Sequence, residues 1–315
     1  MPSFRLLLAG SVAVAMLQVA SSAAQDVRSH EKVSFYFAAH QDDWQLFMNP
    51  SAFVDVADPK AKTVFIHMTA GDAGAGTGTR GRRHPFYLAR ENGAEAAIRF
   101  MADADQMPLH RTASRLLFNG HAIYRVSYRN TVSYFLRVPD GNPEGSGYRE
   151  TGNQSLQRLA DGRIRTLTAI DGSTVYGGWI DLVTTLRALI DHERGRAPFV
   201  QLNVGELNAN ANPNDHSDHR MTARAALDAA KGLACARRLH YVNYASARLP
   251  ENLNSHQRDM ESSVFAVTSA GVRAFDHSSN WQFYDRSYVG RNYFRAEEGT
   301  GRCDAPSPLL STARR

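Results

Sequence analysis

The sequence predicts an α/β fold in which a mostly parallel sheet is covered by helices on both faces. Three observations lead to this prediction. Short apolar runs typical of buried strands recur along the chain, amphipathic stretches with helical spacing separate them, and no internal repeat interrupts the alternation. Successive parallel strands need a long crossover between them, and a helix is the usual crossover, so this rhythm favours a parallel sheet.

Six segments are expected to be strands. Residues 33–39 (VSFYFAA) and 64–69 (VFIHMT) are short continuous apolar runs, as in strands buried on both faces. Two further segments flank a polar Arg-Asn-Thr turn and predict an inserted β-hairpin. These are residues 122–128 and 132–138, and the remaining two expected strands are residues 199–204 and 239–244.

The helices are expected between and after these strands. Apolar residues recur at three- and four-residue steps across residues 86–102, which predicts a helix with one buried face. Similar patterns predict helices at residues 179–192, 219–231 and 252–271, whereas residues 140–155 are rich in Gly, Pro, Asn and Ser and predict a loop. The polar and aromatic tail that follows is expected to pack on the main domain.

The N-terminus reads as a secretory signal. Arg5 precedes an apolar run at residues 6–19, and small residues suited to signal peptidase follow at 20–24. The run is shorter than the roughly 20 residues that span a bilayer, although an uncleaved membrane anchor is the alternative. We therefore expect a signal peptide at 1–24, a secreted or periplasmic protein without stable membrane insertion after cleavage, a main domain at 25–250, and a C-terminal helix and tail at 251–315 packed on the same domain.

Charge and cysteine content limit the classes of partner and site. The formal net charge is +5, and the densest basic cluster, at residues 80–84, is too short and too poor in aromatic neighbours to predict a nucleic-acid partner. A solvated loop, or a rim that attracts an anionic glycan, accounts for it. The two cysteines, Cys235 and Cys303, exclude a four-cysteine metal site. After export they either form one disulfide that ties the tail to the domain or remain unpaired.

Two clusters of metal-binding residue types lie where expected strands end. Residues 39–43 (AHQDD) follow the first strand, and residues 215–219 (DHSDH) lie between the 199–204 strand and the next helix. A third polar segment, residues 69–74 (TAGDAG), follows the 64–69 strand. Ligands of open α/β sheets bind beyond the carboxyl ends of the strands, so these clusters mark the candidate site.

Metal-dependent hydrolysis requires what these clusters contain. Three protein ligands leave one zinc position open for water, a carboxylate exchanges protons with the water and the leaving amine, and a further group stabilises the oxyanion. Adjacent side chains of extended backbone point in opposite directions, so we expect one of Asp42 and Asp43 to bind the metal and the other to transfer protons. His216 and His219 are three residues apart, so one can bind metal while the other faces the substrate.

The motifs resemble those of the LmbE-like, or PIG-L-like, deacetylase family. AAHQDDW at 38–44 is similar to the family's AHPDD signature, and HSDH at 216–219 is similar to its HPDH signature. TAGD at 69–72 and the helix bearing Arg90, Glu91 and Glu95 resemble two further family segments, and the resemblance extends over residues 32–245. It implies a Rossmann-like three-layer sandwich and zinc-dependent hydrolysis of the linear, non-peptide amide of an N-acetylglucosamine-type sugar or glycoconjugate.

The resemblance also implies a role for each motif residue. By position, the metal ligands are His40, Asp43 and His219, and the metal is Zn²⁺ or another divalent ion such as Fe²⁺ or Co²⁺. The implied catalytic residues are Asp42 as general base and later acid, His216 at the oxyanion, and Asp218 as the carboxylate that orients His216 and keeps it protonated. Arg90 matches a basic position in the substrate pocket.

Four departures from the family pattern bear on the substrate. Gln41 and Ser217 replace prolines, and Asn214 stands where some members carry a tyrosine that assists the oxyanion. Trp44 replaces an acidic residue, so it is expected either to offer a stacking surface to a sugar ring or to serve packing only. None of these changes removes an implied ligand or the base.

Three functional hypotheses therefore remain. The first is a deacetylase whose partner is an N-acetylated sugar or glycan. The second is a metal hydrolase of the same fold that cleaves another amide or an ester. The third is a catalytically silent carbohydrate-binding protein, which would be expected to have lost a ligand or the base.

Overall fold

The computed structural model describes residues 30–104 and 106–304. The expected signal at 1–24 and the last residues of the tail lie outside this part of the chain. Among the described residues, no helix has both the length and the hydropathy needed to cross a membrane.

Within the described part of the chain, eight strands form one central sheet in the order β10-β9-β8-β1-β2-β5-β4-β3. The five strands from β9 to β5 in this order run parallel, and antiparallel strands extend the sheet at both edges. This confirms the predicted mostly parallel α/β sheet. The strands are β1 (Lys32–Ala38), β2 (Ala61–Thr69), β3 (Thr112–Phe118), β4 (His121–Tyr128), β5 (Thr131–Val138), β8 (Phe199–Gly205), β9 (Arg237–Tyr241) and β10 (Phe294–Glu297). A separate two-stranded sheet pairs β6 (Leu167–Thr168) with β7 (Val175–Tyr176).

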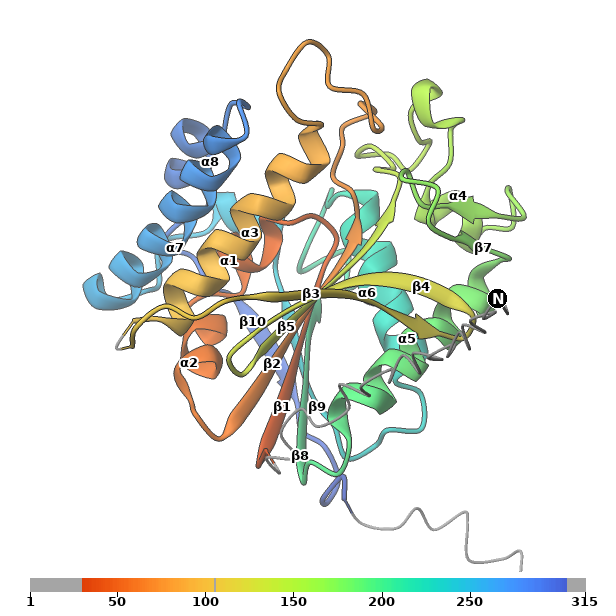
Figure 1. Cartoon of the computed structure of the whole chain (residues 1–315). Coiled ribbons are helices and arrows are strands. Elements are labelled where there is room, and N and C mark those ends of the chain that lie inside the picture. The colour runs from red at the N-terminus through yellow and green to blue at the C-terminus, as the bar shows by residue number, and fades with distance from the viewer. Residues whose placement is uncertain (1–29, 105, 305–315) are drawn as a thin grey trace, which may run out of the picture.

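Helices cover both faces of the sheet (Figure 1). Because successive strand residues point to opposite faces, β1 sends Phe35 and Phe37 into one core and Tyr36 and Ala38 into the other. The first core is closed by α4 (Leu156–Ala160), α5 (Trp179–Arg194) and α6 (Ser217–Ala229), and the second by α1 (Asp43–Phe47), α2 (Ser51–Ala57), α3 (Phe86–Ala102) and α7 (Ser255–Ala274). The molecule is therefore a three-layer sandwich, as predicted.

The expected hairpin is built into the main sheet. Residues 122–128 and 132–138 correspond to β4 and β5, which pair antiparallel, but β5 also pairs in parallel with β2. It is therefore a central strand. The edge strand β3 was not predicted, because its residues are mostly exposed and lack a clear apolar face. The short helices α1 and α2 were not predicted either, since five and seven residues are too few to show helical periodicity.

The C-terminal segment packs on the same sheet and helices. Helix α7 crosses α3 where two glycines meet, and a Cβ atom on Gly271 would lie 2.7 Å from the Cα of Gly93. This close approach fixes α7 beside the middle of α3. Helix α8 (Trp281–Ser287) follows, and β10 then pairs with β9 at the sheet edge.

A disulfide joins Cys235 to Cys303 and closes a loop of 68 residues. Cross-linking a loop of this length reduces the entropy of the unfolded chain and is worth about 4 kcal/mol. We expect the Cys235→Ser/Cys303→Ser double variant to unfold at a lower urea concentration than the oxidised protein by about this free energy. Reduced wild-type protein serves as the control, because it should match the double variant. An unchanged unfolding midpoint would show that the bridge contributes nothing to stability.

Candidate functional site

The polar clusters predicted from the sequence meet at the carboxyl edge of the sheet. Strand β1 is paired in parallel with β2 on one side and β8 on the other. The segments that follow these strands therefore leave the sheet at the same edge, which brings residues 40–43 beside residues 215–219. Asp140, which follows β5, reaches the same edge.

A tight turn after β1 orients His40 and Asp43. The backbone N–H of His40 donates to Asp43 Oδ2 at 2.8 Å, and the N–H of Asp43 is 3.4 Å from the carbonyl oxygen of His40. Asp43 then begins α1, with Asp42 immediately before it. The turn places Asp42 and Asp43 differently, since Asp43 is buried whereas Asp42 reaches toward α3.

The start of α6 presents the second motif. His216 precedes the helix, and its Nδ1 accepts the backbone N–H of Asp218 at 3.1 Å, which is a side-chain cap of the helix. His219 lies in the first turn of α6 and is 2 % exposed. The backbone at the start of α6 therefore positions the imidazoles of His216 and His219.

His40, Asp43 and His219 form a buried group able to hold a metal ion. Asp43 Oδ1 lies 3.2 Å from His219 Nε2 and 3.5 Å from His40 Nδ1, and the two imidazole centroids are 5.2 Å apart. Two histidines and a carboxylate are ligands that suit zinc and other first-row divalent metals. The structure thus brings together the three residues that the sequence predicted as ligands.

Two observations indicate that these residues fit a cation. His219 Nε2 is buried without a hydrogen-bond partner and faces Asp43, and the His40 nitrogen nearest to Asp43 is Nδ1, so each imidazole turns one nitrogen toward the carboxylate. Burial lowers the pKa of His219, but the charges of Asp43 and Asp215 outweigh burial and raise this pKa to about 10. Burial likewise raises the pKa of Asp43, yet His219 and His40 hold it well below its ordinary value. The carboxylates therefore favour positive charge at this position, which protons or a metal ion can supply.

Asp215 is a further candidate residue, whose contact with His219 was not predicted from the sequence. Its Oδ1 lies 2.8 Å from His219 Nδ1, and its Oδ2 accepts from the Nδ2 of Asn212 at 2.9 Å. A carboxylate on one imidazole nitrogen keeps the proton there and leaves the other nitrogen free to bind metal. In the sequence, the four-residue spacing between Asp215 and His219 within DHSDH could have indicated this contact.

A second group able to hold a metal shares His40 with the first. It consists of His40, Asp140, His216 and Asp218, all buried. Asp140 is held in place by Asp72, whose Oδ1 accepts the N–H of Asp140 at 3.0 Å. Asp140 was also missed in the sequence, although a Pro-Asp-Gly directly after an expected strand at the same sheet edge could have indicated it.

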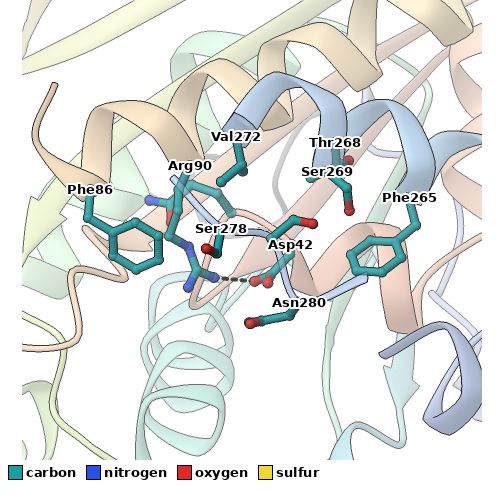
Figure 2. Close-up of a pocket in the computed structure, with 11 residues that line it drawn as sticks. Asp42, Phe86, Arg90, Phe265, Thr268, Ser269, Val272, Ser278 and Asn280 are labelled. Atoms are coloured by element: carbon teal, nitrogen blue, oxygen red, sulfur yellow. Dashed lines mark hydrogen bonds and ion pairs between the residues drawn. The ribbon is translucent and has the colours of Figure 1, made fainter. Parts of the chain in front are cut away.

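Asp42 forms an ion pair with Arg90 of α3, and the pair is drawn in Figure 2. Both side chains line the same cavity as His40 and Asp43. The guanidinium balances the charge of Asp42 and fixes its position, while Glu95, one turn further along α3, pairs with Arg111 instead. Asp42 belongs to neither buried group of possible metal ligands.

The expected interaction between Asp218 and His216 is not formed. The closest approach of His216 Nδ1 to Asp218 Oδ2 is 3.9 Å, because that nitrogen already accepts a backbone N–H. Asp218 Oδ2 instead accepts the N–H of Gly141 at 2.8 Å and lies 3.4 Å from His40 Nε2. Burial, together with the nearby His40 and His219, lowers the pKa of His216 to about 2. The contact through which Asp218 was predicted to orient His216 is therefore replaced by a backbone hydrogen bond to His216 in this structure.

Trp44 does not offer a stacking surface in the cavity. Its side chain is fully buried, its ring packs on Phe65 with centroids 4.6 Å apart, and its Nε1 donates to His67 Nε2 at 3.2 Å. The helical turn at Asp43 directs residue 44 into the core beneath the sheet edge. Trp44 therefore serves packing, and its predicted contact with substrate was wrong.

Aromatic side chains from three separate segments line the cavity beside His40 and Asp43 instead. Phe86 comes from the start of α3, Tyr244 follows β9, and Tyr284 comes from α8. The cavity is also lined by His40, Asp42, Asp43, Arg90 and His216. None of the three aromatic residues belongs to a sequence motif, so only the tertiary structure identifies them.

Replacing Asp215 by Asn tests its role beside His219. Asparagine keeps the shape but loses the charge that holds the proton on Nδ1, so we expect a 10- to 100-fold weaker metal affinity. Competition with a chromogenic chelator measures this change. Asp228→Asn, a half-buried position further along α6, is the control, and equal metal affinity in both variants would contradict the role.

No protein-family model matches the chain, and a search of curated proteins finds no relative. Among solved structures, the chain is similar to N,N'-diacetylchitobiose deacetylase from Pyrococcus horikoshii complexed with its inhibitor MPG. The sequence identity is 15%, the TM-score is 0.45, and the alignment covers 87% of this chain and 88% of the other. At this level of similarity the likeness assigns no residue role, and the roles rest on the geometry described above.

Proposed function

We propose that this protein is an exported, metal-dependent hydrolase that removes the acetyl group from an N-acetylated amino sugar or glycoconjugate. One observation carries the proposal. Asp43 lies between His40 and His219 in one buried ligand group, and His40 and Asp43 line the same cavity as a second carboxylate, Asp42, which is not part of that group. That combination suits hydrolysis of an amide.

The metal would be zinc, or another divalent ion such as Fe²⁺ or Co²⁺, held by His40, Asp43 and His219. When bound, it would polarise the amide carbonyl and make water a better nucleophile at neutral pH. Hydrolysis adds water across the amide bond and yields acetic acid and a free amine, so one proton must move from the water to the leaving nitrogen.

Asp42 is the group placed to move that proton. Its carboxylate accepts the proton from the attacking water and then donates it to the amine as the C–N bond breaks. The ion pair with Arg90 holds the carboxylate in position at the wall of the cavity. Arg90 is therefore a positioning residue for Asp42 in this proposal, in addition to any contact with substrate.

His216 is the residue proposed to stabilise the oxyanion. Because its Nδ1 accepts a backbone N–H, the ring proton of a neutral imidazole lies on Nε2. His216 lines the cavity and can donate that proton in a hydrogen bond to the developing oxyanion. Asp218 contacts His40 Nε2 and the backbone N–H of Gly141, so in this proposal it positions these groups and does not orient His216.

The substrate and the location rest on separate grounds. The amino sugar is inferred from the motif resemblance, and the aromatic rings of Phe86, Tyr244 and Tyr284 supply apolar faces of the kind that pack on sugar rings. Export is inferred from the signal-like residues 1–24, and a disulfide between the two cysteines suits an oxidising compartment.

Acetate release tests this function directly. The purified protein, loaded with Zn²⁺, Fe²⁺ or Co²⁺, is incubated with N-acetylglucosamine oligomers, peptidoglycan fragments and glycolipids, and products are followed by mass spectrometry. We expect loss of one acetyl group from at least one class, abolished by a chelator and restored by metal. A metal-loaded protein that releases no acetate from any of them would contradict the proposal, and hydrolysis of other amides or esters would then identify the alternative chemistry.

A further inference from the structure

An arginine stands in a backbone conformation that favours glycine, three residues before Asp140. Arg137 has a φ of +56° within β5. The pairing of β2 with β5 shifts register there, so two residues of β5, Leu136 and Arg137, lie opposite the single residue Met68. Glycine adopts such a conformation without strain, whereas a residue with a Cβ atom adopts it at a cost. This outlier points to a function for the arginine side chain.

The Arg137 side chain is buried, and its guanidinium is bound on three sides. Its Nε and Nη2 donate to the two carboxylate oxygens of Glu91, both at 2.7 Å, and its Nη1 donates to Asp171 Oδ2 at 2.7 Å. The ring centroids of Tyr124 and Tyr87 lie 4.6 Å and 5.3 Å from its Cζ atom, where the rings stabilise the cation. Arginine suits this position because its planar group binds a carboxylate through two parallel hydrogen bonds.

The contact with Glu91 fixes the rotation of α3 about its own axis. Glu91 is buried and directly follows Arg90 on this helix. Successive residues of an α-helix point about 100° apart, so holding Glu91 against Arg137 also fixes the direction in which Arg90 leaves the helix. That direction is toward Asp42, with which Arg90 forms its ion pair (Figure 2).

The Arg90 side chain has little freedom to correct for a helix that has turned. Gly71 lies against it, since a Cβ atom on Gly71 would be 2.9 Å from Arg90 Nε. The guanidinium of Arg90 also lies over the ring of Phe86, with its Cζ atom 5.7 Å from the centroid. A small rotation of α3 would therefore separate Arg90 from Asp42, because the side chain cannot absorb it.

We propose that Arg137 is a positioning residue of the hydrolase: through Glu91 it holds α3 in the rotation at which Arg90 orients Asp42. This inference rests on the proposed function, in which Asp42 transfers the proton. Neither Arg137 nor Glu91 is among the described residues that line the cavity beside His40, so neither touches a substrate there. A role in stability alone is the competing explanation, and the two differ in what they predict for turnover.

The Glu91→Gln variant tests the positioning role in turnover. Glutamine has the shape of glutamate, but its amide nitrogen cannot accept a hydrogen bond, so the two-bond pair with Arg137 is broken. We expect kcat for acetate release to fall about 10- to 100-fold, as for a small displacement of a catalytic group, with KM close to the wild-type value. The same substitution in an Arg90→Leu background should leave the kcat of that background unchanged, because Glu91 acts through Arg90.

Glu193→Gln is the matched control for these measurements. Glu193 is likewise buried and paired, with Lys62 and with the hydroxyl of Tyr134. Lys62 lies near the start of β2, at the sheet edge opposite the site. We expect this variant to unfold at lower urea concentration but to keep kcat in both backgrounds. An unchanged kcat in folded Glu91→Gln, or an equal loss with and without Arg90, would overturn the inference.

A double variant covers the case in which Glu91→Gln folds poorly. Glu91→Leu/Arg137→Met replaces both charges of the pair by apolar side chains, and such replacement of a buried ion pair is often neutral or stabilising. Asp171 keeps Arg115 at 3.3 Å. We expect the double variant to fold and to show the same loss of kcat as Glu91→Gln. Full kcat in the folded double variant would leave the pair with a role in stability alone and would refute the positioning role.

Crystal structures of wild type, Glu91→Gln and Glu193→Gln test the geometry without turnover. We expect the ion pair of Arg90 with Asp42 in wild type and in Glu193→Gln, and its loss in Glu91→Gln. An intact ion pair in Glu91→Gln would contradict the inference. Loss of the ion pair in Glu91→Gln, in a protein that hydrolyses no amide, would support the positioning of Arg90 by Arg137 and Glu91 and would count against the proposed function instead.

Discussion

Replacing Asp42 by Asn is expected to lower kcat about 10²- to 10⁴-fold, the range attributed to a general acid–base group, and to leave metal content unchanged. Asparagine has nearly the shape of aspartate and can still accept a hydrogen bond from Arg90. It cannot take a proton from water or return one to the leaving amine. Because Asp42 belongs to neither buried group of possible ligands, the metal should stay bound.

The measurement is acetate release at saturating substrate together with metal analysis of the same sample. Asp140→Asn is an informative companion variant, because Asp140 lines the same cavity but forms no ion pair with Arg90. A larger loss of kcat for Asp140→Asn than for Asp42→Asn would transfer the role of base to Asp140. Full activity of Asp42→Asn would remove Asp42 from the mechanism.

His219→Ala is expected to abolish both stoichiometric metal binding and activity. The substitution removes one of three protein ligands, and it leaves the carboxylate of Asp215 buried beside an empty space. An uncompensated buried charge is strongly destabilising, so the variant should also unfold at lower temperature. His219→Gln, which retains a polar atom at this position, separates loss of metal from loss of folding.

Metal per chain is measured after equilibration with excess Zn²⁺ and desalting, and His192→Ala is the control, since His192 is an exposed histidine on α5. We expect about one ion per chain in wild type and in His192→Ala, and far less in both His219 variants. A folded His219→Gln that retains full metal content and activity would contradict the assignment of His219 as a ligand.

The central sheet could be predicted because its strands carry their own signal. The runs at 33–39 and 64–69 are apolar on both faces, since helices cover both sides of a parallel sheet. The edge strand β3 has no such constraint, because its side chains are largely exposed. Helix α1 is only five residues long, and that short turn sends Trp44 into the core, which residue type alone did not predict.

The candidate site was predictable only where its residues lie within the two short motifs at 39–43 and 215–219. His40, Asp43 and His219 follow expected strands, and the parallel pairing of β1 with β8 brings them together. Asp140 and the ion pair of Arg90 with Asp42 depend on contacts between distant parts of the chain. Tyr284 comes from the C-terminal segment, and only the packing of α8 places it near the site.

Anomalous X-ray diffraction from crystals of the zinc-loaded protein tests the central claim most directly, because the two groups of possible ligands share His40 and only the position of the ion separates them. We predict one strong anomalous peak at bonding distance, about 2.0–2.2 Å, from His40, Asp43 and His219. A peak bound instead by Asp140, His216 and Asp218, or no peak in this cavity, would contradict the proposed metal centre.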